Sequence, residues 1–94
     1  MSTRPRKANR DKALDIFGHI PGIGPAMAGD LWDLGMRSMV DLAVGNPEAM
    51  YTETRRQAGG EMDRCVLYVY RCAVAFAKDP DLEADLRQWW KWKD

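Results

Sequence analysis

The sequence predicts an all-α fold, a single small domain of five to six helices. The 94 residues are enough for one modest hydrophobic core. Apolar residues make up 46% and charged residues 30% of the chain, an ordinary balance for a globular protein. Apolar positions recur every three to four residues, without the alternation of a strand, and glycines and prolines divide them into short segments.

Residues 1–9 lack apolar periodicity and are predicted to form a flexible basic arm, so the helical domain is expected over residues 10–94. A first helix is expected from about Arg10 to Phe17, with Ala13 and Leu14 on its apolar face. Gly18 is expected to end it.

A second helix is expected from Pro25 to about Leu34. Pro25 suits the first turn, where its missing N–H would have no partner. Gly35 suits the position after the helix end, which often has a left-handed conformation. The 34–38 segment has one glycine where a second hairpin would need two, so a second hairpin is at most degenerate.

Two shorter helices are expected next. Ser38 and Asp41 have the spacing of a capping box, for a helix that ends at Gly45. Asn46 followed by Pro47 is typical of a helix start, and this fourth helix is expected to end near residues 59–60.

The longest predicted helix covers Glu61 to about Lys78. It carries two apolar stripes, which predicts a central helix packed on both sides. Asp79 and Pro80 are expected to end it and to open a last helix that runs to Trp92.

The stretch between the first two helices, residues 20–28, is the most informative motif. Gly22 and Gly24 lack a Cβ and allow a sharp turn and a close approach of backbone. The free amides at the start of the next helix suit a phosphate oxygen. The sequence therefore predicts contact with a nucleic-acid backbone.

This hairpin, with its Gly-x-Gly-x-x-x-Ala spacing and pegs Ile20 and Ile23, resembles that of the helix-hairpin-helix superfamily. Together with residues 30–35, 63–68, 71–73 and 89–94, it resembles a small bacterial family named after a pathogenicity locus. The resemblance covers about residues 13–94 and implies the fold, with one helix-hairpin-helix motif, rather than an activity. It also permits a monovalent cation, K⁺ or Na⁺, on the hairpin carbonyls; no other cofactor is expected.

We therefore expect weak binding to duplex DNA without sequence preference, through phosphate contacts. The candidate DNA-binding residues are Gly22, Ile23, Gly24 and Ala26 in the hairpin, and Arg4, Arg6, Lys7 and Arg10 in the arm. Three features weaken this prediction: the net charge is zero, Asp30 and Asp33 follow the hairpin, and no Lys or Arg follows Gly24 directly. The structural alternative is that the glycines only let two helices pack closely.

Two further sets could form a partner or base-stacking face: Arg64, Tyr68 and Arg71 on the long helix, and Trp89, Trp90 and Trp92 near the end. The simpler interpretation is that the tryptophans cover the core and the arginines pair with Asp30, Asp33 or the acids of residues 79–85. If the hairpin is only architectural, the alternative function is a protein–protein adaptor. The oligomeric state is left open by the sequence.

Several classes of function are not expected. No catalytic residues are predicted: Val40-Asp41 resembles a glycosylase segment, but no hairpin lysine accompanies it, and His19 is interpreted as a helix-end cap. Cys65 and Cys72 lie too far apart on one helix for a disulfide, and no metal site is expected. The chain has neither a membrane-spanning run nor a signal-peptide core, which predicts a cytoplasmic location.

Overall fold

The computed structural model describes the backbone of residues 6–94 and the side chains of residues 9–94. Within residues 6–94 all regular structure is helical, as predicted. It comprises α1 (Arg6–Phe17), α2 (Pro25–Asp33), α3 (Met39–Ala43), α4 (Pro47–Gln57) and α5 (Cys65–Lys78), followed by two 3₁₀ turns, η1 (Ala84–Arg87) and η2 (Trp89–Trp92). Of the predicted arm, residues 1–5 lie outside the described residues, and α1 begins four residues before the expected Arg10.

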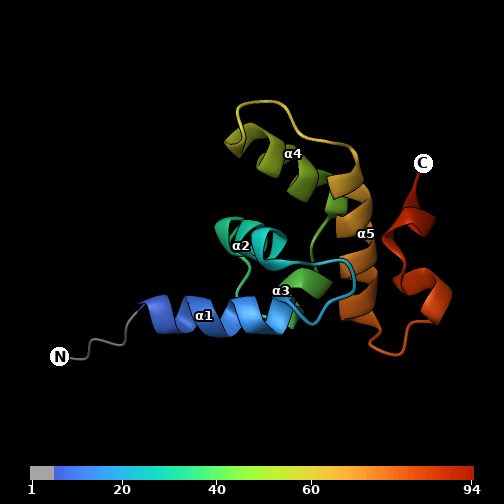
Figure 1. The fold of residues 1–94 in the computed structure, drawn as a ribbon, viewed down its shortest axis with the longest axis horizontal. Coiled ribbons are helices and arrows are strands. Elements are labelled where there is room, and N and C mark those ends of the chain that lie inside the picture. Colours follow the sequence, from blue (N-terminus) through green and yellow to red (C-terminus); the bar gives the residue numbers. More distant parts are fainter. Residues whose placement is uncertain (1–5) are drawn as a thin grey trace.

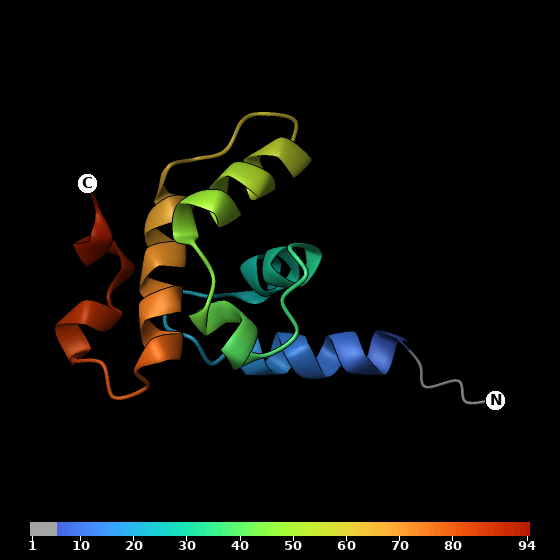
Figure 2. The ribbon, with the colours of Figure 1, turned by 180° about the vertical axis from the view of Figure 1, so that it is seen from behind.

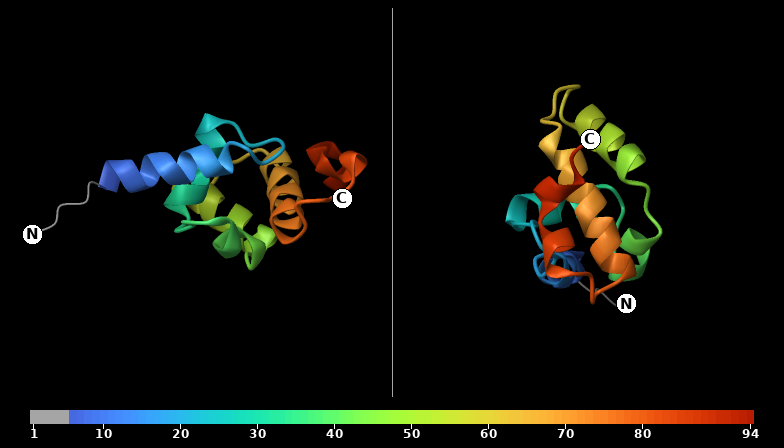
Figure 3. Two further views of the ribbon diagram at one scale, coloured as in Figure 1. Left: turned by 90° about the horizontal axis from the view of Figure 1, so that it is seen from below. Right: turned by 90° about the vertical axis from the view of Figure 1, so that its right-hand side faces the viewer.

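Helix α5 is the centre of the domain, as its two apolar stripes predicted. It packs against α3 and α4 on one side and against η2 on the other. The C-terminal segment therefore lies on the outer side of α5, away from α2 and α4 (Figures 1 and 2). The described start of α1 and this C-terminal segment lie at opposite ends of the molecule (Figure 3).

The core is built from the inner faces of all five α-helices. Its largest fully buried side chains are those of Tyr70, Phe17, Leu31, Leu42, Leu67 and Cys72. The Tyr70 hydroxyl shares a 2.8 Å hydrogen bond with the buried Thr54 hydroxyl, which satisfies both polar groups. Burial raises the pKa of Tyr70 to about 12.

The caps predicted for α2, α3 and α4 are present. Gly35 has φ +94° at the end of α2, and the Met36 amide reaches back to the Leu31 carbonyl, which closes the helix end. The Ser38 hydroxyl accepts the Asp41 amide, and the Asn46 side chain accepts the Ala49 amide.

Helix α5 begins at Cys65, not at Glu61. The Met62 carbonyl accepts a 2.8 Å hydrogen bond from the Tyr51 hydroxyl, which holds residue 62 in the loop. The Asp63 carboxylate accepts a 2.8 Å hydrogen bond from the amide of Cys65, the first residue of the helix. This hydrogen bond holds the pKa of Asp63 below its ordinary value.

The prediction of a last helix from Pro80 to Trp92 is wrong. The segment forms η1 and η2 instead, separated by an extended Gln88 with φ −94° and ψ 113°. Side chains take the carbonyls that a helix would use: Arg87 donates to the Leu82 carbonyl, and the Trp92 indole donates to the Leu86 carbonyl. Packing on α5 therefore decides the local shape here, since such short helical turns are unstable alone.

Candidate nucleic-acid interface

The hairpin between α1 and α2 is a tight turn over residues 20–23. The Ile23 amide donates to the Ile20 carbonyl at 3.0 Å, with Pro21 and Gly22 between them and φ +85° at Gly22, the pattern of a type II turn. Ile20 and Ile23 are buried, so they anchor the turn in the core. The Ile23 amide, one of the expected phosphate donors, is thus already used inside the turn.

Gly24 is the N-cap of α2, in an extended conformation with φ −93° and ψ −176°. It is exposed, and a Cβ built there would meet nothing within 4 Å. Within residues 9–94, no acceptor bonds to the amides of Gly24, Ala26 or Met27. These donors lie at the positive end of the helix dipole, and the space around Gly24 is open, so they can donate hydrogen bonds to an anion.

Gly22 has a different environment. A Cβ on Gly22 would lie 3.4 Å from Cδ1 of Trp89 and 3.7 Å from a methyl of Val69. The left-handed conformation and this close approach both explain why glycine suits the position. Gly22 therefore joins the hairpin to α5 and to the C-terminal segment, which is an architectural role.

A groove of about 450 Å³ lies beside the hairpin, between α1 and the start of α2. Asp11 and Asp15 line it, together with His19 and Pro25. The His19 ring bonds to the Asp15 carbonyl at 2.7 Å, which is the helix-end role expected for it. On α2, partial burial and then the charge of Asp33 raise the pKa of Asp30.

The predicted basic residues are placed only in part. Arg4 lies outside the described residues, and Arg6 and Lys7 fall in the first turns of α1, where only the backbone is described. Arg10 crosses to α2: one of its terminal nitrogens lies 3.4 Å from the position that a Cβ of Gly29 would occupy. Arg10 therefore lies along α2 and not at the α2 N-terminus.

The Arg64 row is held by the end of the chain. Asp94 pairs with Arg64 at 2.7 Å and with Arg71 at 2.9 Å, and Arg71 also pairs with Glu48 at 3.1 Å and donates to the Trp92 carbonyl. The arginines thus form ion pairs, but with Asp94 and Glu48 in place of the expected acids. Tyr68 packs partly against the core, and its hydroxyl lies 3.4 Å from Asp94.

The tryptophans are divided between covering α5 and facing solvent. Trp89 and Trp92 are half-buried, whereas Trp90 is 48% exposed and meets Trp89 edge to face. We call residues 84–94 the C-terminal strap, since they lie along α5 and are held there by Trp89, Trp92 and Asp94.

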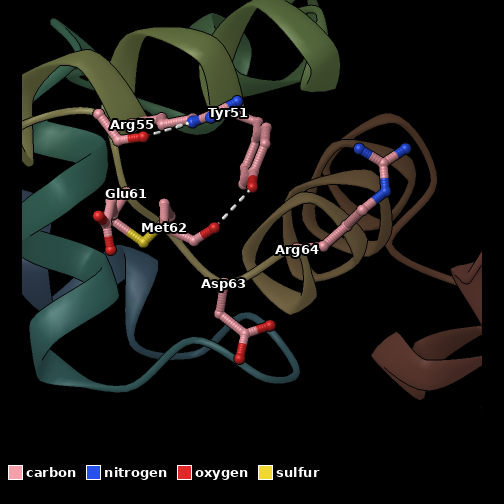
Figure 4. Close-up of a pocket in the computed structure, with 7 residues that line it drawn as sticks. Tyr51, Arg55, Glu61, Met62, Asp63 and Arg64 are labelled. Carbon is pink, nitrogen blue, oxygen red and sulfur yellow. Dashed lines mark hydrogen bonds between the residues drawn. The ribbon is translucent and has the colours of Figure 1, made fainter.

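A further pocket, about 710 Å³, lies between α4 and the loop before α5 (Figure 4). Two of its polar side chains already have partners: the Tyr51 hydroxyl donates to the Met62 carbonyl, and Arg55 donates to the Gly60 carbonyl at 2.7 Å. Arg64 points away from Tyr51, toward the strap (Figure 4). The side chains of Tyr51 and Arg55 therefore have a structural role here, because they join α4 to the loop before α5.

Comparison with known proteins gives one match. No curated protein and no solved structure matches the chain. Among the described helices, none combines the length and the apolarity needed to cross a bilayer, and residues 9–94 contain no cluster of metal-ligating side chains. The match to the family described as pathogenicity locus extends over residues 10–94, nearly the whole chain, and the protein therefore belongs to the Cdd1 family.

Proposed function

We propose that this protein binds duplex DNA weakly and without sequence preference, with α1, the hairpin and α2 acting as a helix-hairpin-helix motif. The observation that carries the proposal is the set of backbone amides of Gly24, Ala26 and Met27, which have no acceptor within residues 9–94. A phosphate oxygen would accept hydrogen bonds from these amides, as anions do at helix N-termini. The tight turn and the buried Ile20 and Ile23 would hold these donors rigidly.

The surrounding charges explain why binding should be weak. Asp11 and Asp15 line the groove beside the hairpin, and no cation follows Gly24 directly. The basic residues Arg4, Arg6 and Lys7 would supply non-specific attraction from the N-terminal side. Non-specific complexes of this kind have dissociation constants of roughly 10⁻⁴ to 10⁻⁶ M near physiological salt. A K⁺ or Na⁺ ion on the hairpin carbonyls would offset part of the acidic charge and belongs to the same proposal.

The substitution Gly24→Asp tests the site. The backbone at Gly24 suits an N-cap, so the new carboxylate should accept the free amides and stabilise α2 slightly, while it occupies and repels the phosphate position. We expect duplex affinity, measured by fluorescence anisotropy at low ionic strength, to fall about tenfold or more. Gly24→Ser is the matched control, because it can cap the same amides without a charge.

Two outcomes would count against the proposal. If the unmodified protein shows no salt-dependent binding to duplex DNA, the function is wrong. If Gly24→Asp binds as well as Gly24→Ser, the hairpin is not the phosphate site. A variant with Arg4, Arg6 and Lys7 replaced by Gln then shows whether the N-terminal residues bind alone.

A second candidate function, a protein–protein adaptor, has its own supporting observation. Gly22 packs on Trp89, which gives the hairpin a purely structural use. Val40, Val44 and Trp90 are exposed apolar side chains, with Val40 at 72% and Val44 at 80%. Under this function, Gly24→Asp should leave every interaction of the protein unchanged.

A further inference from the structure

A second groove lies on the other side of α1 from the hairpin. It has a volume of about 420 Å³ and is lined by Asn9, Lys12, Ala13, Ile16, Trp32 and Arg37, which we call the cationic groove. The four α1 residues have the spacing i, i+3, i+4 and i+7, so they share one face of that helix. Trp32 comes from α2, and Arg37 comes from the loop before α3.

The charge of this groove is uncompensated. None of its lining residues is acidic. Within residues 9–94, no carboxylate forms an ion pair with Lys12 or Arg37, and residues 1–8 contain no Asp or Glu. The nearby Asp41 bonds to the backbone amide of Arg37 at 2.8 Å and not to its guanidinium. Two cations therefore line the groove without a carboxylate partner among residues 9–94.

Arg37 is also held in place. Its Nη1 donates to the carbonyls of Trp32 and Met36 at 2.8 and 3.0 Å, and its guanidinium carbon lies 3.5 Å from the centre of the Trp32 ring. The remaining nitrogens have no hydrogen-bond partner among residues 9–94. A fixed guanidinium with free N–H groups loses little conformational freedom when it binds a carboxylate, which favours that interaction.

The apolar lining indicates which anion fits. Ile16 is 43% exposed, although it is a large aliphatic side chain. Arg37 covers one face of Trp32, and the ring also packs against the core, so a nucleic-acid base could stack there only after Arg37 moved away. A peptide with an aliphatic side chain against Ile16 and carboxylates beside Lys12 and Arg37 would match the apolar and the charged groups of the groove.

We propose that the cationic groove docks an acidic peptide segment of a partner protein, with an aliphatic residue between carboxylates. This site shares no lining residue with the hairpin groove and does not depend on DNA binding. It gives the protein a protein-binding surface opposite the proposed phosphate site.

The test uses a fluorescein-labelled peptide of sequence Asp-Leu-Glu-Asp-Leu-Glu and the full-length protein at low ionic strength. We expect saturable binding, and loss of about tenfold in affinity in Lys12→Glu/Arg37→Glu, since two attractions become repulsions. Lys78→Glu/Lys91→Glu is the matched control: it changes the net charge equally at exposed lysines outside the groove and should bind within about twofold of the unmodified protein. Because Arg37 also supports its loop, Lys12→Glu and Ile16→Asp are tested singly, and each should weaken binding.

Several outcomes would overturn the proposal. They are the absence of binding, equal binding of the Asn-Leu-Gln-Asn-Leu-Gln peptide, or equal losses in the groove variant and the control. Tighter binding of a ten-nucleotide oligothymidine that depends on Lys12 and Arg37 would assign the groove to nucleic acid. Gly24→Asp should leave peptide binding intact, so a failure of the DNA proposal and a failure of this one are separable.

Discussion

Helix α1 has grooves of similar volume on its two sides, and they carry opposite charge. On one side Asp11, Leu14, Asp15 and Gly18 face the hairpin, and on the other side Asn9, Lys12, Ala13 and Ile16 face Trp32 and Arg37. Both sets follow the same i, i+3, i+4, i+7 spacing, about half a turn apart around the helix. One helix therefore offers an acidic groove beside backbone donors and a cationic groove beside apolar side chains.

This difference shows that the charge of a site and its hydrogen-bonding groups can favour different ligands. The hairpin side has free amides suited to an anion, but its side chains repel anions. The cationic groove has side chains that attract anions. Its Trp32 ring is less suited to stacking on a nucleic-acid base, because Arg37 covers one face of the ring. The sum of charges, which is zero for the chain, hides this separation.

The largest expected effect separates the two hairpin glycines. Gly22→Ser should lower the free energy of unfolding by about 1–2 kcal/mol, because a non-glycine residue is strained at φ +85°. The same substitution at Gly24 should change stability by no more than about 0.5 kcal/mol, since its backbone is extended and its surroundings are open. Urea unfolding of both variants measures the difference.

Gly22→Ser also tests whether the two grooves are independent. It should disturb the contact with Trp89 and leave the Lys12 side of α1 unchanged, so acidic-peptide binding should persist wherever the variant is folded. Equal stability of the two serine variants would show that Gly22 is not under conformational constraint, and would remove the architectural explanation of the hairpin.

A smaller effect is expected from neutralising the acidic groove. If phosphate binds at the start of α2, Asp11→Asn/Asp15→Asn should raise duplex affinity about fivefold at low ionic strength, because two repulsive charges are removed. The gain should shrink as salt is added, since exposed charges are screened. Fluorescence anisotropy against salt concentration provides the measurement.

Asp81→Asn/Asp85→Asn is the matched control for this prediction. It changes the net charge by the same amount, at exposed acids that do not line the hairpin groove. An equal gain in the two double variants would mean that DNA senses only the net charge, and the hairpin groove would lose its special role.

Much of this arrangement could be predicted from the sequence, because local signals determine it. Ser38, Asn46 and Gly35 end or begin helices through contacts within a few residues, and all three act as expected. The all-α class follows from the same signals together with the apolar spacing. The acidic side of α1 could also have been predicted from Asp11 and Asp15, which lie one helical turn apart.

The parts that sequence reasoning missed depend on contacts between distant residues. Arg37 joins Lys12 only because the turn at Gly35 brings the loop back over Trp32. The strap is not a helix because Arg87 and Trp92 bond to backbone carbonyls and Trp89 packs on Gly22, 67 positions earlier. Helical spacing carries no information about such contacts.

The smallest expected effect concerns Asp94, which helps to hold the strap and so the Trp89 side of the hairpin. Its hydrogen bonds to Arg64 and Arg71 hold the pKa of Asp94 below its ordinary value of 3.8. A carboxyl whose pKa is lowered by folding stabilises the folded state above its unfolded pKa, and this contribution is lost as pH falls through the folded pKa. Asp94→Asn should therefore give a slightly lower Tm than the unmodified protein above about pH 4, and the gap should close as the pH falls below the ordinary pKa of a carboxyl group. Tryptophan fluorescence during thermal unfolding at each pH follows both the Tm and the strap. A gap that is the same at every pH would mean that the charge of Asp94 does not hold the strap, and the Trp89–Gly22 contact would then have to hold it without this ion pair.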